Sequence, residues 1–365
     1  MNEGKKPTCL ISPQVDFWML GGGAILAWAV LVLCGNYTNV VGVGDITNNL
    51  PMTLSFAQLF INYPHFMASY HLCYRRGFPF LRKHWMQTLA VPFLLLAIFC
   101  YIGALTTQPG QQAAARNWLG AMVVVMYFSV GWHYTKQAFG CVMAYSNYTG
   151  YRLENIQRET MRYAILSVWW YKFAHDAHGA SGALFDLTFS WPSLPAWIEP
   201  LSLYVFLGLQ GWLFYRVFLV NARKGMMPHP NLVVPYLAIM VWSLPQLQMN
   251  NLCFAIIPFF HSLQYLAFVY RIENSHEIRD TYHFHGQLYY SILAVGLVTT
   301  GWLSFLAVPG GLDAAVANKA VLGIPFFILC FFLFINIHHY FLDNTLWKMR
   351  EDPMVARALF GPREA

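Results

Sequence analysis

Long apolar runs recur along almost the whole chain, and they limit its fold more than any other feature. A helix of about 20 apolar residues crosses a hydrocarbon core about 30 Å thick, and only helices or closed barrels satisfy their backbone hydrogen bonds there. The pattern therefore predicts an all-α, polytopic membrane helix bundle of about ten transmembrane helices. The candidate spans are 17–35, 52–74, 85–105, 118–145, 163–173, 197–220, 232–247, 252–270, 288–308 and 320–342.

The composition agrees with a membrane protein. Of the 365 residues, 57% are hydrophobic and only 10% are charged, whereas roughly 25% of the residues of a soluble domain are charged. The seven cysteines show no spacing typical of a disulfide framework or a zinc site. Because no internal repeat and no long linker separates the runs, we expect a single integral membrane domain over residues 1–365.

The net charge of +6 is spread between the apolar runs, so nucleic acid is not expected as a partner. When the connecting segments are assigned alternately to the two sides of a membrane, nearly all lysines and arginines fall on one side. Only Arg116 and Lys319 fall on the other, which by the positive-inside rule predicts two cytoplasmic termini. We therefore expect an integral protein of a bacterial inner membrane, in contact with membrane lipids, whose first span is retained and not cleaved as a signal peptide.

Histidines occur inside four of the apolar runs. His65, His261 and His338 each precede a basic residue by ten positions, which places each about 15 Å inside its charged helix end, and His133 lies near the middle of its long run. Ionisable residues at this depth are costly and indicate a site. Neutral imidazoles from facing helices suit zinc, copper or iron. The alternatives are hydrogen bonds between helices or a proton relay.

Further candidates follow from spacing, because residues three or four apart share one face of a helix. His71 follows His65 by six positions, on a partly different face, and is an additional candidate ligand. Tyr265 lies beside His261, and Asp343 can accept a hydrogen bond from a metal-bound imidazole or can instead pair with cations at its helix end. Lys136 lies beside His133, where it either extends toward the membrane surface or meets an anionic group of a substrate.

Histidines also occur in two polar loops. His175 and His178 have the i,i+3 spacing of metal ligands, but in an outer loop they are expected to be a hydrated pair. An inner loop contains three more histidines, His276, His283 and His285, which are expected to be solvated. Alternatively, they cover the histidine site from the cytoplasmic side.

The four histidine motifs, in this order, resemble those of the Brp/Blh family of membrane β-carotene dioxygenases. The resemblance implies an iron held by His65, His133, His261 and His338. The second histidine of the family's third motif is replaced here by Tyr265, which implies that one ligand has moved to His71 or His339. The matching segments are Pro64-His65, Trp132-His133-Tyr134, Phe260-His261-Ser262, and Ile337-His338 with Asp343 after it.

Together these features predict a membrane-embedded, histidine-ligated metalloenzyme. The resemblance implies a non-haem iron (Fe²⁺) oxygenase that uses O2 on a hydrophobic, carotenoid-like or lipid-like substrate. The candidate catalytic residues, chosen for their spacing to the histidines, are Lys136, Tyr265 and Asp343. Neutral ligands leave the charge of the ion available for Lewis acid chemistry, and a dry cavity limits side reactions. The alternatives are another transition metal, a haem-b electron-transfer protein with His133 and His261 as axial ligands, or a transporter with a histidine site at the membrane midplane.

Overall fold

The computed structural model describes residues 7–36, 57–247, 251–282, 286–316, 322–347 and 352–361. Within these ranges the chain is helical apart from one small β-hairpin. Some residues singled out above lie outside the described ranges, namely His283, His285 and Lys319; Lys348, the basic residue ten positions after His338, also lies outside them.

The described elements follow one another with short connections, and four of the long helices contain a π-helical turn (η1, η2, η3 and η5). In chain order the elements are α1 (Pro13–Phe17), η1 (Trp18–Gly22), α2 (Gly23–Asn36), α4 (Asn62–Tyr74), α5 (Gly77–Lys83), η2 (Met86–Ala90), α6 (Val91–Thr107), α7 (Gln112–Tyr148), α8 (Asn155–Asp176), β1 (Ser181–Leu184), β2 (Leu187–Ser190), α9 (Ile198–Leu213), η3 (Phe214–Leu219), α10 (Val220–Arg223), α11 (Pro230–Ser243), η4 (Pro245–Leu247), α12 (Asn251–Glu273), α13 (His276–Tyr282), α14 (Gln287–Trp302), η5 (Leu303–Ala307), α15 (Val308–Val316), α17 (Phe326–Leu346) and α18 (Pro353–Phe360).

Among the described residues, six helical segments are long and apolar enough to cross a membrane. The chain is therefore an all-helical membrane protein, as the sequence predicts. Exposed apolar side chains such as Phe93 on α6, Tyr204 on α9 and Ile292 on α14 form surfaces suited to lipid. The six segments are Pro13–Leu33, Met86–Thr107, Gln112–Tyr148, Ile198–Arg223, Gln287–Val316 and Phe326–Leu346.

The other four predicted spans fall on α4, α8, α11 and α12, which are not among these six. With 13 and 14 residues, α4 and α11 are each about 20 Å long and shorter than the hydrocarbon core. The 22-residue α8 contains the short run 163–173 and begins with a capping box of Glu154 and Gln157. The helices α4 and α11 are therefore too short to cross the hydrocarbon core completely.

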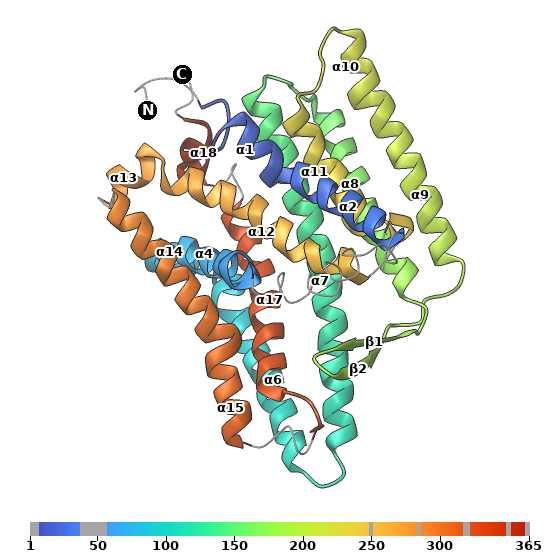
Figure 1. Ribbon diagram of the computed structural model, residues 1–365, viewed down its shortest axis with the longest axis vertical. Coiled ribbons are helices and arrows are strands. Elements are labelled where there is room, and N and C mark those ends of the chain that lie inside the picture. Colours follow the sequence, from blue (N-terminus) through green and yellow to red (C-terminus); the bar gives the residue numbers. More distant parts are fainter. Residues whose placement is uncertain are drawn as a thin grey trace.

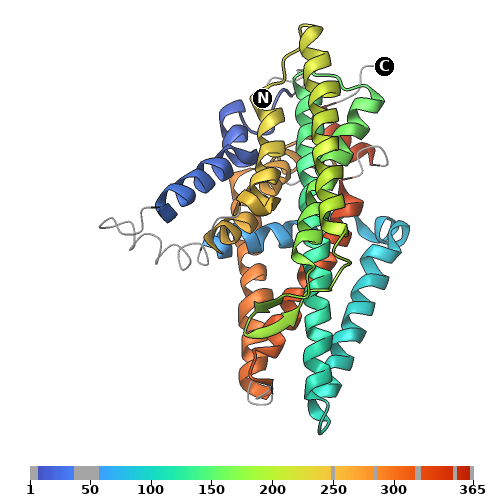
Figure 2. The ribbon, with the colours of Figure 1, turned by 90° about the vertical axis from the view of Figure 1, so that its right-hand side faces the viewer.

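The helices do not all run parallel. In Figure 1, α7 and α17 follow the long axis of the molecule, whereas α12 lies across it; the turned view in Figure 2 shows that α4 also lies across that axis. The start of α17 is held by Asp313, whose carboxylate accepts hydrogen bonds from the backbone N–H groups of Phe327 and Ile328 at 2.8 and 3.0 Å. The crossing of lengthwise and transverse helices brings distant parts of the sequence together.

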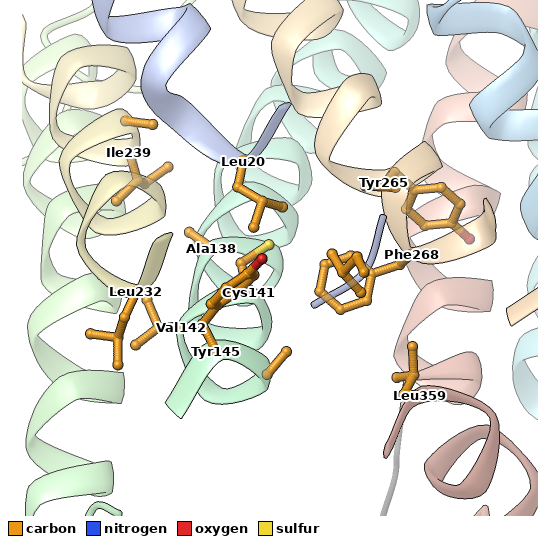
Figure 3. Close-up of a cluster of buried hydrophobic side chains, with 14 of the residues drawn as sticks. Leu20, Ala138, Cys141, Val142, Tyr145, Leu232, Ile239, Tyr265, Phe268 and Leu359 are labelled. Atoms are coloured by element: carbon orange, nitrogen blue, oxygen red, sulfur yellow. The ribbon is translucent and has the colours of Figure 1, made fainter. Parts of the chain in front are cut away.

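A large apolar cluster fills the end of the molecule that contains α1 and α18 (Figure 1). Figure 3 shows Leu20, Tyr145 and Phe268 in this cluster, contributed by η1, α7 and α12. Close packing depends on Gly21, because a Cβ there would lie 2.4 Å from the backbone oxygen of Val234 on α11.

A second apolar cluster lies between α6, α7 and α17, and the hairpin covers it. The antiparallel strands β1 and β2 pair Ser181 with Ser190, and the buried Leu187 and Phe189 of β2 pack into the cluster. The loop between α8 and α9, which includes this hairpin, therefore folds onto the bundle.

Candidate metal centre

Four histidines and one aspartate from four helices meet in the interior. One metal-binding atom from each of His65, His261 and His339 lies within 4.8 Å of the others, and the same holds for His133, His339 and Asp343. All five side chains are buried. The two groups share His339, so α4, α7, α12 and α17 contribute to one continuous cluster.

The spacing of the donor atoms suits a transition-metal ion. His133 Nε2 lies 3.1 Å from His261 Nε2, and His339 Nε2 lies 3.4 Å from Asp343 Oδ2. Two nitrogens bound to one ion at about 2.1 Å are separated by about 3.0 Å in octahedral and about 3.4 Å in tetrahedral geometry. These two pairs of atoms therefore already have the separation of two ligands bound to one ion.

Several donor atoms of the cluster lack other partners. Among the described residues, no hydrogen-bond partner reaches His65 Nε2, His261 Nδ1, either ring nitrogen of His339, or Asp343 Oδ2. Buried polar atoms without partners are unfavourable by about 1–3 kcal/mol each. Since each of these four residues also offers one ligand atom to the clustered groups that share His339, the arrangement fits a bound cation.

The tautomer of His65 follows from its neighbours. Its Nδ1 lies 2.5 Å from the backbone carbonyl oxygen of Asn62 and 2.8 Å from Ser262 Oγ. Because a carbonyl only accepts, Nδ1 carries the proton and Nε2 carries the lone pair. Ser262 Oγ in turn lies 2.9 Å from Asn62 Oδ1. A metal-binding histidine is usually fixed in this way by a hydrogen bond from its other nitrogen.

The two oxygens of Asp343 have different surroundings. Oδ1 accepts hydrogen bonds from Ser69 Oγ and Tyr265 Oη, both at 2.9 Å, and these two hydroxyls lie 2.5 Å apart. Oδ2 faces His339 Nε2 and, at 3.7 Å, His133 Nε2. One oxygen is therefore held by hydroxyl donors, and the other is directed at the histidines.

His338 and His71 lie outside this cluster. His338 Nε2 donates to the carbonyl oxygen of Gln87 at 3.0 Å, so its Nδ1 accepts from the hydroxyl of Tyr70 at 2.9 Å, and neither nitrogen is left for a metal. His71 Nε2 lies 3.3 Å from Arg75 Nη1, next to the ion pair of Arg75 with Glu273. The structure thus brings together His65, His133, His261, His339 and Asp343 from the sequence-predicted set.

A cavity of about 1050 Å³ opens beside the cluster, and His133, Asp343 and Tyr265 are part of its wall. Lys136 lies in the same cavity, where its ammonium group donates to Asn344 Oδ1 and lies 4.3 Å from the centre of the Trp132 ring. Ligand pockets usually have volumes of about 300–1,000 Å³, so this cavity is large enough for a sizeable substrate.

His175 in the last turn of α8 and His178 in the loop after it form a separate group with Glu199. His175 Nδ1 and His178 Nε2 lie 2.7 and 2.8 Å from the two carboxylate oxygens of Glu199. His178 is exposed. Since each imidazole has a carboxylate partner, this group is satisfied without a metal.

Sequence reasoning missed Asn62 and Ser262 as residues that orient His65. The signal was present for Asn62, which precedes His65 by three positions and shares its helix face. It was absent for Ser262, whose contact with His65 spans 197 positions. Tyr340 was also missed; its ring stacks on His133 with ring centres 4.8 Å apart.

Comparison with known proteins adds no relative: no family model matches the chain, and no curated protein or solved structure matches it. The site's own geometry therefore carries the functional argument.

Proposed function

We propose that this chain is a membrane-embedded metalloenzyme whose cluster of His65, His133, His261, His339 and Asp343 holds a transition-metal ion. The observation that carries the proposal is the convergence of buried donor atoms that have no other described partner. His339 belongs to both three-residue groups, which makes it the central ligand. Nitrogen donors with one carboxylate suit iron, copper, manganese or zinc.

We propose iron and oxygenase chemistry for this centre. The support is the resemblance of the histidine motifs to those of the Brp/Blh family. Three histidines of these motifs, His65, His133 and His261, take part in the cluster. In the fourth motif His339 takes the place of His338. Bound Fe²⁺ supplies the capacity to activate O2. The ligand set is largely neutral, so little of the positive charge of an ion is cancelled, and the buried surroundings exclude water. The substrate is a hydrophobic, carotenoid-like or lipid-like compound that enters the adjoining cavity.

The residues around the ligands have distinct roles in this proposal. Tyr265 and Ser69 hold Oδ1 of Asp343, so that Oδ2 stays directed at the centre. Tyr265 is at the same time part of the wall of the cavity. Lys136, three positions after His133 on α7, places a positive charge in the same cavity.

A haem group is less well supported than an ion. Axial ligands on opposite sides of a haem iron are separated by about 4 Å, twice a metal–nitrogen bond of about 2 Å. The Nε2 atoms of His133 and His261 lie 3.1 Å apart, which leaves no room for a porphyrin between the two rings.

We further propose that the bundle has about ten membrane-inserted helical segments and two cytoplasmic termini, and that it lies in a bacterial inner membrane. The support is the strong bias of lysine and arginine toward one set of connections. In this arrangement α4 and α12 are inserted obliquely, with α14 and α17 packed against α4 and with η1 and α2 packed against α12.

Oxygen incorporation tests the enzymatic part of the proposal. Iron-loaded protein is incubated with a membrane lipid extract and isotopically labelled dioxygen, and the lipids are analysed by mass spectrometry. We expect labelled oxygen in a hydrophobic product, and none with chelator-treated protein or with the variant His133→Ala. Folded, iron-loaded protein that leaves every lipid fraction unlabelled would contradict the oxygenase assignment.

A further inference from the structure

The cavity beside the metal centre reaches the end of the bundle that contains α1 and α18 (Figure 1). Its wall includes His133 at one end and Asn147 at the other, both on α7. Fourteen residues of helix correspond to about 20 Å. The cavity therefore extends far enough along α7 to hold an extended chain.

The middle of the cavity is apolar. Phe139, Met143, Leu166 and Phe268 contribute to its wall between the metal centre and the far end. An aliphatic or polyene chain would bury apolar surface there, which favours its binding.

The far end of the cavity is cationic. Arg152, Arg158 and Arg162 are part of its wall, together with one acidic residue, Glu159, which pairs with Arg162 at 3.4 Å. Within the part of the chain that the structure describes, Arg152 and Arg158 form no ion pair. Arg158 instead donates to Asn155 Oδ1 at 3.2 Å. Two guanidinium groups are therefore available to an anion at this far end, which we call the mouth of the cavity.

We infer that the cavity binds an amphiphile with one long apolar chain and an anionic headgroup, a carboxylate or a phosphate. The headgroup pairs with Arg152 and Arg158, and the chain extends past Met143 toward His133. Arginine suits this role because its planar N–H groups match carboxylate and phosphate oxygens in pairs. A neutral hydrocarbon would leave the mouth without a charge partner.

This inference rests on the proposed function, because it names the substrate class of the same centre. Within that proposal it selects a charged lipid over a carotene-like hydrocarbon. The reaction would act on the part of the chain that lies beside His133, far from the headgroup.

Photo-crosslinking tests the inference. The probes are an oleate analogue with a diazirine in its chain and the corresponding oleyl alcohol analogue, which has the same chain without the charge. Both are added to the full-length protein in zwitterionic nanodiscs, and labelled peptides are identified by mass spectrometry. We expect the acid to label peptides that contain Met143 or Phe268 at least fivefold more than the alcohol does.

Two double variants locate the charge requirement. Arg152→Gln/Arg158→Gln removes the two cations of the mouth, and we expect at least a fivefold loss of labelling by the acid. Arg82→Gln/Arg223→Gln removes two exposed arginines outside the cavity wall, and labelling should change less than twofold. Equal labelling by acid and alcohol, or an unchanged Arg152→Gln/Arg158→Gln variant, would overturn the inference.

Competition separates an amphiphile site from a simple anion site. Unlabelled dodecyl phosphate should displace the acid probe, whereas inorganic phosphate at the same concentration should not. Displacement by inorganic phosphate alone would overturn the inference, because the apolar chain would then contribute nothing.

Labelling requires no metal, so the two proposals fail separately. Charge-dependent labelling of a protein that never binds a metal would leave the ligand class standing and remove the proposed function. Stoichiometric metal together with equal labelling by the acid and the alcohol would remove the ligand class and leave the proposed metal site standing.

Discussion

The Nε2 atoms of His133 and His261 lie 3.1 Å apart, although the two residues are 128 positions apart in the chain. Each side chain is buried, on α7 and α12 respectively. One N–H···N hydrogen bond between them would satisfy a single pair of ring nitrogens. The Nδ1 of His261 and both nitrogens of His339 would still lack described partners. A cation bound by one ring nitrogen of each histidine and by Asp343 explains why these side chains meet at one place, and this relationship leads to the following predictions.

Replacing His339 should remove the metal, because His339 belongs to both groups of donors. We expect His339→Ala to lower the metal affinity at least 100-fold, measured by metal titration of the purified protein. His338→Ala is the matched control one position earlier on α17, since both nitrogens of His338 are already hydrogen bonded. Loss of metal in the control and retention in His339→Ala would contradict the assignment.

Replacing Ser262 should weaken metal binding without unfolding the protein. Ser262 Oγ contacts His65 Nδ1 at 2.8 Å, and residues that orient a metal ligand contribute about 10–100-fold to affinity. Ser262→Ala is compared with Ser167→Ala, which removes another buried hydroxyl, one bonded to the Ala164 carbonyl at 2.7 Å. Each variant loses more than one hydrogen bond, each worth about 1 kcal/mol of stability, but only Ser262→Ala should change the metal titration.

The charge of Asp343 and its hydrogen bonds can be separated. Asp343→Asn keeps a side-chain oxygen for Ser69 and Tyr265 but removes the negative charge that faces His339. Tyr265→Phe keeps the charge and removes one donor. We expect a loss of metal affinity of about 100-fold for Asp343→Asn and of about tenfold for Tyr265→Phe. Equal affinities for Asp343→Asn and the wild type would show that Asp343 is not a ligand.

The space around two glycines, Gly21 on η1 and Gly208 on α9, predicts opposite effects of their replacement by alanine. A Cβ at Gly21 would lie 2.4 Å from the Val234 backbone oxygen, whereas at Gly208 on α9 it would meet no atom within 4 Å. Gly21→Ala should destabilise the protein by about 1–3 kcal/mol. Gly208→Ala should stabilise it by up to about 1 kcal/mol, because alanine favours the helix. Thermal unfolding in one detergent compares the two, and equal midpoints would contradict the close contact of η1 with α11.

The sequence alone predicts the all-helical membrane class, because continuous apolar runs leave few other folds. It does not separate full spans from the shorter α4 and α11. It also does not show that α4 and α12 lie across the long axis (Figures 1 and 2), since apolar pattern reports burial and not orientation.

The choice between His338 and His339 shows the same limit within the site. Adjacent helix positions differ in direction by about 100°, and the depth argument from the basic helix ends favours His338. The structure directs His339 toward the other histidines and His338 toward Tyr70. Which face of α17 meets the bundle depends on tertiary packing, and no local pattern in the sequence determines it. By contrast, the i,i+4 pair of His339 and Asp343 could be identified from spacing.

Metal analysis of the purified protein tests the central claim most directly. The wild-type chain and the double variant His133→Ala/His339→Ala are purified from metal-supplemented cultures, and each is analysed by inductively coupled plasma mass spectrometry. The account predicts at least about one transition-metal ion per wild-type chain, predominantly iron, and less than about a tenth of that in the double variant, with both eluting as folded protein. A folded wild-type chain without a stoichiometric metal, or a double variant with the same metal content, would contradict it.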